Sequence, residues 1–277
     1  MTEAPRKLGI VAGGGSLPGL VAREAIAQGR NVHIVALEGF AEPDLLPADV
    51  PQTPMPLGAG GRMIDLFRAE AVADIVLVGP VRRPGLRDLK PDWKTVKVLT
   101  KASLKGLGDD GLLGMVRDGI EAEGFRLLGI ADILPDLLAR PGLIAGNAPD
   151  EQAVSDIDRG IEVVTALGAA DIGQAAIVQQ GIVLAVEAIE GTDAMLARAG
   201  DLRREGEGGV LVKLVKPGQD RRLDLPTIGR QTVKGAIAAG LRGIAVSAGA
   251  CQIVEAEAVK SDVEAAGLFL IGVEAPA

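Results

Sequence analysis

Short apolar runs separated by amphipathic segments dominate the first half of the chain. An apolar run over 8–12 predicts a buried strand, and a glycine-rich turn, a helix over 19–28 and a strand over 31–36 follow. A strand, a helix and a strand in this order predict a parallel sheet with a right-handed crossover. The pattern further predicts helices over 62–71, 92–101 and 111–123, strands over 73–78 and 125–129, irregular chain over 40–56 and a basic loop over 84–91.

The second half of the chain restarts after a stretch, 132–149, that holds three of the sixteen prolines. Beyond it, the pattern predicts helices over 151–167, 192–200, 232–239 and 259–266 and strands over 175–179, 182–188, 209–215, 244–246 and 268–272. The first two of these strands are expected to pair as a hairpin around Gln180 and Gly181. The fold class is therefore α/β with two domains: 1–133, with a Rossmann-like parallel sheet, and 134–277, a catalytic domain with a mixed sheet. We expect a cleft between them.

The amino-acid composition limits the kinds of core and catalytic site that the chain can form. The 277 residues are 48% apolar but only 2% aromatic, so Ala, Val, Ile and Leu must build the core. A single cysteine excludes a disulfide framework, and one cysteine with one histidine is too little for an ordinary zinc site. A catalytic metal would therefore be a hard cation on carboxylate oxygens. Any Cys–His pair would need Cys251 and His33, and we assign neither a role.

The charge balance bears on partners and location. The net charge of −8 argues against a nucleic-acid-binding surface, so we expect no nucleic-acid partner. The sequence opens without a secretory signal and holds no stretch of about 20 apolar residues. We expect a cytoplasmic protein without a membrane anchor.

A glycine-rich turn joins the first predicted strand to the first predicted helix. Gly13, Gly14 and Gly15 let the backbone approach a phosphate, and the helix start near Ser16 and Leu17 adds N–H groups and partial positive charge. The turn lacks the Lys-Ser/Thr of a P-loop and the spacing of a dinucleotide fingerprint. We expect phosphate or nucleotide contact here; the alternative is a tight structural turn.

A second candidate segment follows the strand predicted over 73–78. It holds Gly79, Pro80, Val81 and Arg82. Ligands of open α/β sheets bind beyond the carboxyl ends of the strands, where Arg82 and its neighbour could neutralise a pyrophosphate. A solvated basic loop is an equal alternative.

Two acidic segments could serve a metal or a substrate. Asp109 and Asp110 precede a predicted helix, where capping explains the pair at least as well as a metal. Glu187 lies within an apolar strand, where an unpaired charge is expensive, so it should meet a cation, a substrate hydroxyl or a structural partner. The candidate binding residues of this second segment are Glu187, Ala188, Gly191, Thr192 and Asp193.

The segment 213–224 combines cations and carboxylates. Lys213 alternates with core residues on its predicted strand, and Lys216, Arg221 and Arg222 follow it, together with Asp220 and Asp224. Hydrolysis of a phosphoanhydride needs such a set: cations or a carboxylate-held Mg²⁺ offset charge on the phosphoryl oxygens, and an oxygen base orients water. A solvated charged loop is the alternative.

Taken together, these motifs resemble the LpxI-type UDP-2,3-diacylglucosamine pyrophosphatases of bacterial lipid A synthesis. The resemblance spans nearly the whole chain and rests on segments 9–18, 79–84, 108–110, 171–174, 186–193 and 212–226. The most specific of them are 188–193 and Lys216-Pro217 with Gln219-Asp220. Two positions depart from the expected pattern: Arg230 replaces a proline, and Ser247 replaces an acidic residue.

The resemblance implies a Mg²⁺-dependent hydrolase. It would split UDP-2,3-diacylglucosamine into UMP and 2,3-diacylglucosamine 1-phosphate (lipid X), with two domains enclosing the ligand. Asp224 matches the essential carboxylate, for Mg²⁺ or water, and Asp220 is the reserve. The lipid substrate implies transient contact with the inner membrane surface, and a homodimer is left open.

Two other classes of function compete with this one. The first is a nucleotide-sugar or lipid-sugar binding protein without turnover, although a carboxylate-rich domain would repel a pyrophosphate. The second is a dinucleotide-dependent oxidoreductase with Glu38 as the ribose acid, which the glycine spacing disfavours.

Overall fold

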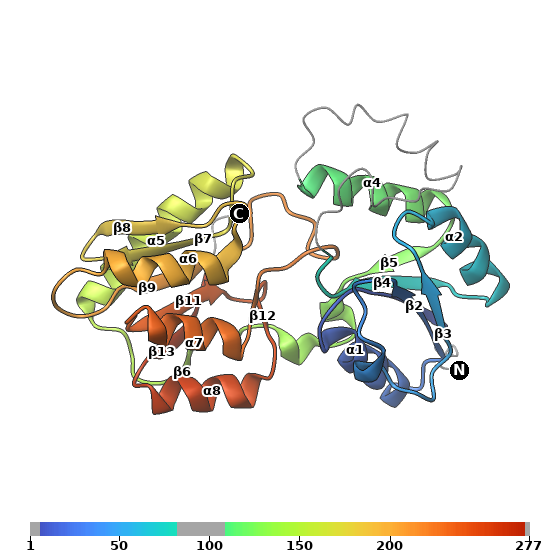
Figure 1. Cartoon of the computed structure of the whole chain (residues 1–277), viewed down its shortest axis with the longest axis horizontal. Helices are drawn as coiled ribbons and strands as arrows, with labels where there is room; N and C mark the ends of the chain where they lie inside the picture. The colour runs from blue at the N-terminus through green and yellow to red at the C-terminus, as the bar shows by residue number, and fades with distance from the viewer. Residues whose placement is uncertain (1–5, 82–108, 275–277) are drawn as a thin grey trace. The chain divides into compact units, whose positions relative to one another are not determined.

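The computed structural model describes residues 6–81 and 109–274, without the side chains of Asp109, Asp110 and Leu112 (Figure 1). The chain divides into two compact units, Met1–Pro135 and Asp136–Ala277. The basic loop expected over 84–91 and the helix expected over 92–101 lie outside the described residues. Within the described part, no helix is both long enough and apolar enough to cross a bilayer.

A parallel five-stranded sheet forms the N-terminal unit. Its strands, in the order β3-β2-β1-β4-β5, are β1 Leu8–Ala12, β2 Val32–Leu37, β3 Gln52–Met55, β4 Asp74–Val78 and β5 Arg126–Leu128. The helices are α1 Leu17–Ala27, α2 Gly60–Ala69 and α4 Asp109–Ala122, with single turns of 3-10 helix at Pro43–Leu45, Ile130–Asp132 and Pro135–Leu137. The parallel sheet predicted from the sequence is confirmed.

The two faces of this sheet bury different side chains, because successive residues of a strand point to opposite sides. Leu8 and Ile10 of β1 join Ala25 of α1 in one fully buried cluster. On the opposite face, the ring of Phe67 from α2 packs over Gly9. Strands buried on both faces have nearly continuous apolar sequences, which is why the pattern revealed them.

A buried carboxylate balances cations at the amino end of this sheet. The fully buried side chain of Asp74 accepts hydrogen bonds from Arg126 (2.8 and 2.9 Å) and Arg30 (2.5 Å), and Arg6 lies 3.2 Å away. Burial is the largest influence on the pKa of Asp74 and would raise it, but the hydrogen bonds from Arg126 and Arg30 outweigh it together, so the net pKa is lowered. The cluster is structural, because ligands of such sheets bind at the opposite edge.

A mixed six-stranded sheet forms the C-terminal unit. Its strands, in the order β6-β13-β11-β9-β7-β8, are β6 Gly142–Ala145, β7 Ala175–Gln179, β8 Ile182–Val186, β9 Val210–Lys213, β11 Gly243–Ser247 and β13 Phe269–Val273. β9, β11 and β13 are parallel, whereas β6, β7 and β8 join through antiparallel pairs. β10 Thr227–Ile228 and β12 Gln252–Ile253 pair separately. The helices are α5 Glu151–Ala169, α6 Gly191–Ala199, α7 Arg230–Ala238 and α8 Ala256–Ala265, and a 3-10 turn spans Gly200–Leu202.

Helices cover both faces of the mixed sheet. α5 packs against one face, where Ala153 and Ile157 join Val212 in a buried cluster. On the other face, α6, α7 and α8 lie side by side over Ile177 and Leu211 (Figure 1). The predicted fold class, two α/β units with a parallel and a mixed sheet, is confirmed.

Two strands contradict the sequence-based expectations. The segment 40–56 was expected to be irregular, yet 52–55 forms β3. β3 is an edge strand, where Pro54 costs no ladder hydrogen bond. Pro54 and the prolines on either side of the strand made this segment look irregular in the sequence. β6 lies within 132–149, the stretch near the expected domain boundary where no strand was expected, and it pairs with the distant β13, a contact that local pattern does not reveal.

The predicted hairpin at Gln180 and Gly181 is confirmed, and α5 holds it in place. Both residues have positive φ, 54° and 75°, as a tight two-residue hairpin turn requires. The carboxylate of Asp156, only 1% exposed, accepts hydrogen bonds from the backbone N–H groups of Gln180 (3.0 Å) and Gly181 (2.7 Å). α5 therefore fixes the turn electrostatically as well as by packing.

Candidate active site

The glycine turn of the N-terminal unit packs against the loop after β4. The N–H of Gly13 donates to the carbonyl oxygen of Val78 (2.7 Å), and the N–H of Gly14 donates to the carbonyl oxygen of Pro80 (3.0 Å). A Cβ on Gly13 would lie 2.6 Å from the carbonyl oxygen of Gly79, closer than real Cβ contacts come. The sequence analysis singled out both loops, and the structure brings them together at the carboxyl ends of β1 and β4, which are neighbours in the sheet.

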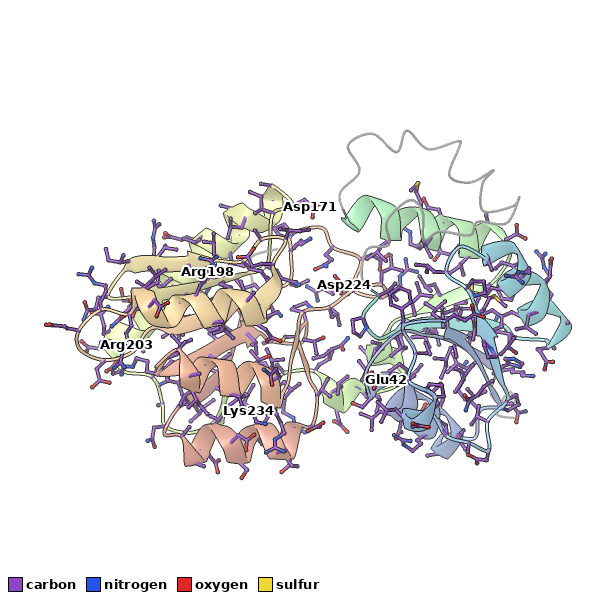
Figure 2. The ribbon with its side chains drawn as sticks, in the orientation of Figure 1. Glu42, Asp171, Arg198, Arg203, Asp224 and Lys234 are labelled. Atoms are coloured by element: carbon purple, nitrogen blue, oxygen red, sulfur yellow. The ribbon has the colours of Figure 1, made fainter. Side chains whose placement is uncertain are left out.

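The third glycine of the turn meets a carboxylate. The N–H of Gly15 donates to Oε1 of Glu42 (3.1 Å), an exposed side chain labelled in Figure 2. The N–H groups of Gly13, Gly14 and Gly15 are therefore all used within the protein. Phosphate contact at this turn stays a prediction, and it would require Glu42 to leave Gly15.

The other predicted residues of this unit hold varied positions. Leu17 opens α1 and packs partly buried against the core, and Ser16 precedes it without a side-chain cap hydrogen bond. Val81 is 39% exposed beyond β4. α4 begins at Asp109, so Asp109 and Asp110 lie within its first turn and do not precede the helix as the capping interpretation expected. Contact of either residue with a metal or a substrate stays a prediction, and Arg82 lies outside the described residues.

In the C-terminal unit, three predicted residues form a buried chain of hydrogen bonds. Nζ of Lys213 donates to Oγ1 of Thr192 (2.8 Å), and that hydroxyl donates to Oε1 of Glu187 (2.5 Å). The exposed fractions of the three are 7%, 9% and 6%. We call this set the Lys213–Thr192–Glu187 chain. The partner of Glu187 is therefore a hydroxyl of the protein itself, with the Lys213 ammonium beside that hydroxyl, which matches the alternative of a structural partner. Contact of Glu187 with a substrate hydroxyl stays a prediction.

The sheet register explains how these residues meet. Ala175 of β7 pairs with Lys213 of β9, and its carbonyl accepts the N–H of Glu187, which follows β8. Lys213, Ala175 and Glu187 therefore form one row across three strands, and side chains in such a row share a face. Because Ala175 is small, Thr192 from the first turn of α6 fits between the two charges.

The turn between β8 and α6 covers this chain. The N–H of Gly191 donates to the carbonyl of Ala188 (3.2 Å), and Gly191 has a φ of 80°. Asp193 is exposed on the first turn of α6. Ala188 and Gly191 thus belong to the short segment that leads from the buried Glu187 into α6, and Asp193 lies on the exposed side of the first turn of α6. Binding of a ligand by these residues stays a prediction.

The loop after β9 carries the predicted catalytic carboxylates. Nε2 of Gln219 donates to Oδ2 of Asp224 (3.0 Å), and Oε1 of Gln219 accepts the N–H of Lys216 (3.2 Å). Gln219 therefore ties the two ends of this loop together. Asp224 is half-buried and is labelled in Figure 2 on the loop that follows β9.

Asp220 has a different environment from Asp224. Arg222 donates to both of its oxygens, from Nε (3.0 Å) and Nη2 (2.8 Å), and its backbone N–H adds a third bond. This two-pronged pairing is strong and fixes Asp220 in place. Asp220 therefore fits a role in shaping the loop, and the catalytic role of Asp224 stays a prediction.

The residues present fit Mg²⁺. Among the described residues, no three or more His, Cys, Asp or Glu side chains are grouped to hold a metal. Mg²⁺ commonly binds through one or two carboxylates, substrate phosphates and water instead of an all-protein cage. The carboxylate of Asp224, oriented by Gln219, matches that mode of binding.

Several residues that the sequence analysis named only within motifs, without a role, make contacts around this loop. Asp171 pairs with Lys216 (2.7 Å), and the backbone N–H of Gln174 donates to Oε2 of Glu187 (3.1 Å). Ser247, at the end of β11, is buried and accepts the N–H of Val215 (2.9 Å). A serine oxygen thus supplies the acceptor at a position where an acidic residue was expected.

Similarity to known proteins covers both units. The model of the LpxI N-terminal domain matches residues 7–137, and that of the LpxI C-terminal domain matches residues 140–271. A protein of Caulobacter vibrioides named UDP-2,3-diacylglucosamine pyrophosphatase LpxI is 40% identical over 276 residues, which cover 97% of this chain and 98% of that protein. The chain belongs to the LpxI family. Membership of the LpxI family confirms the resemblance found in the sequence motifs.

Proposed function

We propose that this chain hydrolyses the pyrophosphate bond of UDP-2,3-diacylglucosamine in lipid A biosynthesis, with Mg²⁺, and releases UMP and lipid X. The name of the Caulobacter relative and the extent of the similarity support the substrate. The observation that carries the chemistry is Asp224, a carboxylate oriented by Gln219 on a loop that also holds Lys216 and Arg222.

The residues of this loop suit the charge of the substrate. A diphosphate carries negative charge that grows on the leaving oxygen as the P–O bond breaks. Bound Mg²⁺, held by Asp224, would offset that charge and polarise the phosphoryl oxygen. Gln219 orients Asp224, and its carbonyl oxygen accepts the backbone N–H of Lys216, whose ammonium pairs with Asp171. An oriented carboxylate also serves to position water for attack on phosphorus.

The proposal includes where the enzyme works. The substrate carries two acyl chains and therefore resides in a bilayer. We propose that the protein acts in the cytoplasm and contacts the inner membrane only transiently, since a lipid substrate does not require an anchored enzyme.

The decisive experiment replaces Asp224 with Asn. The change keeps the shape of the side chain and removes its charge. We expect kcat for UMP release to fall at least about 100-fold, and activity of the unaltered protein to depend on added Mg²⁺ and to stop with EDTA. Asp201→Asn, at an exposed carboxylate after α6, is the matched control and should leave turnover unchanged.

Two outcomes would contradict the proposal. Full turnover by the Asp224→Asn variant would move the catalytic role elsewhere. Tight binding of the UDP-lipid without any UMP release by the unaltered protein would favour the alternative, a binding protein without turnover.

A further inference from the structure

Two turns of the C-terminal unit expose isoleucines. Ile189, between β8 and α6, is 92% exposed, and Ile172, between α5 and β7, is 51% exposed. The other exposed large apolar side chains of the described residues lie between 37% and 50%, so Ile189 stands apart. Single exposed apolar residues are ordinary on protein surfaces, so Ile189 is informative only together with Ile172 and the groups around them.

The two turns are joined through the backbone. A Cβ on Gly173 would lie only 2.1 Å from the carbonyl oxygen of Glu187, so the backbones of the two turns are in contact there. The N–H of Gln174 donates to Oε2 of Glu187 (3.1 Å), which adds a second connection. Ile172 precedes this junction by one residue and Ile189 follows it by two. We call the pair the isoleucine surface.

The carboxylates beside the isoleucine surface are neutralised. Asp171, next to Ile172, pairs with Lys216 at 2.7 Å. Glu190, next to Ile189, pairs with Arg198 at 2.8 Å, and this pairing lowers the pKa of Glu190. The protein as a whole is acidic and Asp193 on the first turn of α6 is exposed, but the carboxylates directly next to both isoleucines are paired with cations. This pairing reduces the repulsion that bare carboxylates would cause at a lipid headgroup layer.

The isoleucine surface is continuous with the candidate active site. Lys216, which holds Asp171, also donates its backbone N–H to Gln219, the residue that orients Asp224. Glu187, at the junction of the two turns, belongs to the Lys213–Thr192–Glu187 chain. Contact made by these turns would therefore take place next to the residues proposed to act on the substrate.

We propose that Ile189 and Ile172 enter the headgroup–hydrocarbon boundary of the bilayer and so place the active site at the membrane that carries its substrate. The inference rests on the proposed function for the lipid nature of that substrate. The occupant is the bilayer itself, because the proposed substrate carries two acyl chains and the carboxylates next to both isoleucines are paired with cations. Two isoleucines without a basic cluster give weak, reversible binding, as an enzyme that moves between lipid molecules needs.

The single cysteine of the chain makes a direct test practical. Cys251 is fully buried, and burial raises the pKa of its thiol to about 12, so it stays unreactive in the folded protein. An Ile189→Cys variant can therefore be labelled at that position alone with a polarity-sensitive fluorophore. Ile182→Cys is the matched control: Ile182 is 50% exposed and begins the same strand whose far end leads to Ile189.

The first measurement uses neutral phosphatidylcholine vesicles without substrate. We expect the emission of the label at position 189 to shift to shorter wavelength as vesicles are added, and the label at position 182 to remain unchanged. No shift at 189, or equal shifts at both positions, would overturn the proposal. A shift of the emission at position 189 on addition of soluble UDP, without vesicles, would also overturn the proposal. It would mean that ligand binding brings protein, and not lipid, over Ile189.

The second measurement separates this proposal from the proposed function. In Ile189→Ser we expect KM for substrate in vesicles to rise about tenfold, the order expected when one isoleucine is lost from an apolar contact. Turnover of a short-chain, water-soluble analogue should not change. Equal effects on both substrates would contradict membrane contact. If the unaltered protein hydrolyses neither substrate, the proposed function fails, while the vesicle measurement still decides the membrane contact.

Discussion

Replacing Lys213 with Met tests whether the Lys213–Thr192–Glu187 chain supports the site or contacts the substrate. Met nearly preserves the volume of the side chain and removes its charge. Thr192 then loses its donor at 2.8 Å, and the buried carboxylate of Glu187 retains the hydrogen bonds from the Thr192 hydroxyl and the Gln174 N–H without the nearby ammonium.

The expected cost follows from that geometry. Breaking a directly paired buried salt bridge costs about 3–5 kcal/mol because it leaves an uncompensated charge. Here a hydroxyl separates the ammonium from the carboxylate, so we expect about 2–3 kcal/mol of unfolding free energy to be lost. For a unit of about 140 residues, this corresponds to a decrease in Tm of about 6–12 °C.

Differential scanning calorimetry can measure this change, since the two units can unfold in separate transitions. The double variant Lys213→Met, Glu187→Gln should recover at least half of the loss, because it leaves no unbalanced buried charge. A Lys213→Met protein that unfolds within 1 °C of the unaltered protein would refute the reasoning. If its KM for the UDP-lipid rose strongly at the same time, Lys213 would instead be a substrate contact.

Two further predictions concern stability. Asp156→Ala should lower the unfolding free energy by about 2 kcal/mol in urea titration, because the N–H groups of Gln180 and Gly181 lose a charged acceptor, and Asp156→Asn should lose less; equal stability of all three proteins would contradict this role. Burial is the main cause that lowers the pKa of His33 below 6.5, so the folded protein binds this proton less readily than the unfolded chain. Stability should therefore fall as pH decreases from 7 to 5.5, by at most about 1.4 kcal/mol per pH unit, and His33→Gln should flatten that slope in thermal unfolding. Parallel pH profiles for the two proteins would exclude His33 as the cause.

Much of the fold follows from local pattern. The hairpin at Gln180 and Gly181 was predictable because two residues with positive φ leave a clear turn signal between apolar runs. β3 and β6 were not, since prolines obscured one and the other is defined only by its partner β13. Edge strands depend on distant pairing, and local sequence carries little of that information.

The site was predictable in chemistry but not in geometry. The apolar setting of Glu187 indicated that the carboxylate needs a partner, and the structure supplies the structural alternative, the hydroxyl of Thr192. The connection of Glu187 to Lys213 through Thr192 depends on the register of three strands around Ala175, and the local sequence does not encode that register. The sequence placed Gln219 in a motif but did not show its role. In the sequence, a glutamine that links Lys216 to Asp224 looks like any other polar loop residue.

The contact between the glycine turn and the loop after β4 limits how this unit can evolve. A methyl group on Gly13 would meet the Gly79 carbonyl, and one on Gly79 would lie 2.4 Å from the Gly14 carbonyl. Neither position can acquire a side chain unless the ends of β1 and β4 separate. Changes in ligand preference in this unit must therefore arise at neighbouring positions such as Ser16 and Val81, because Gly13 and Gly79 cannot carry a side chain at the present spacing of the two loops.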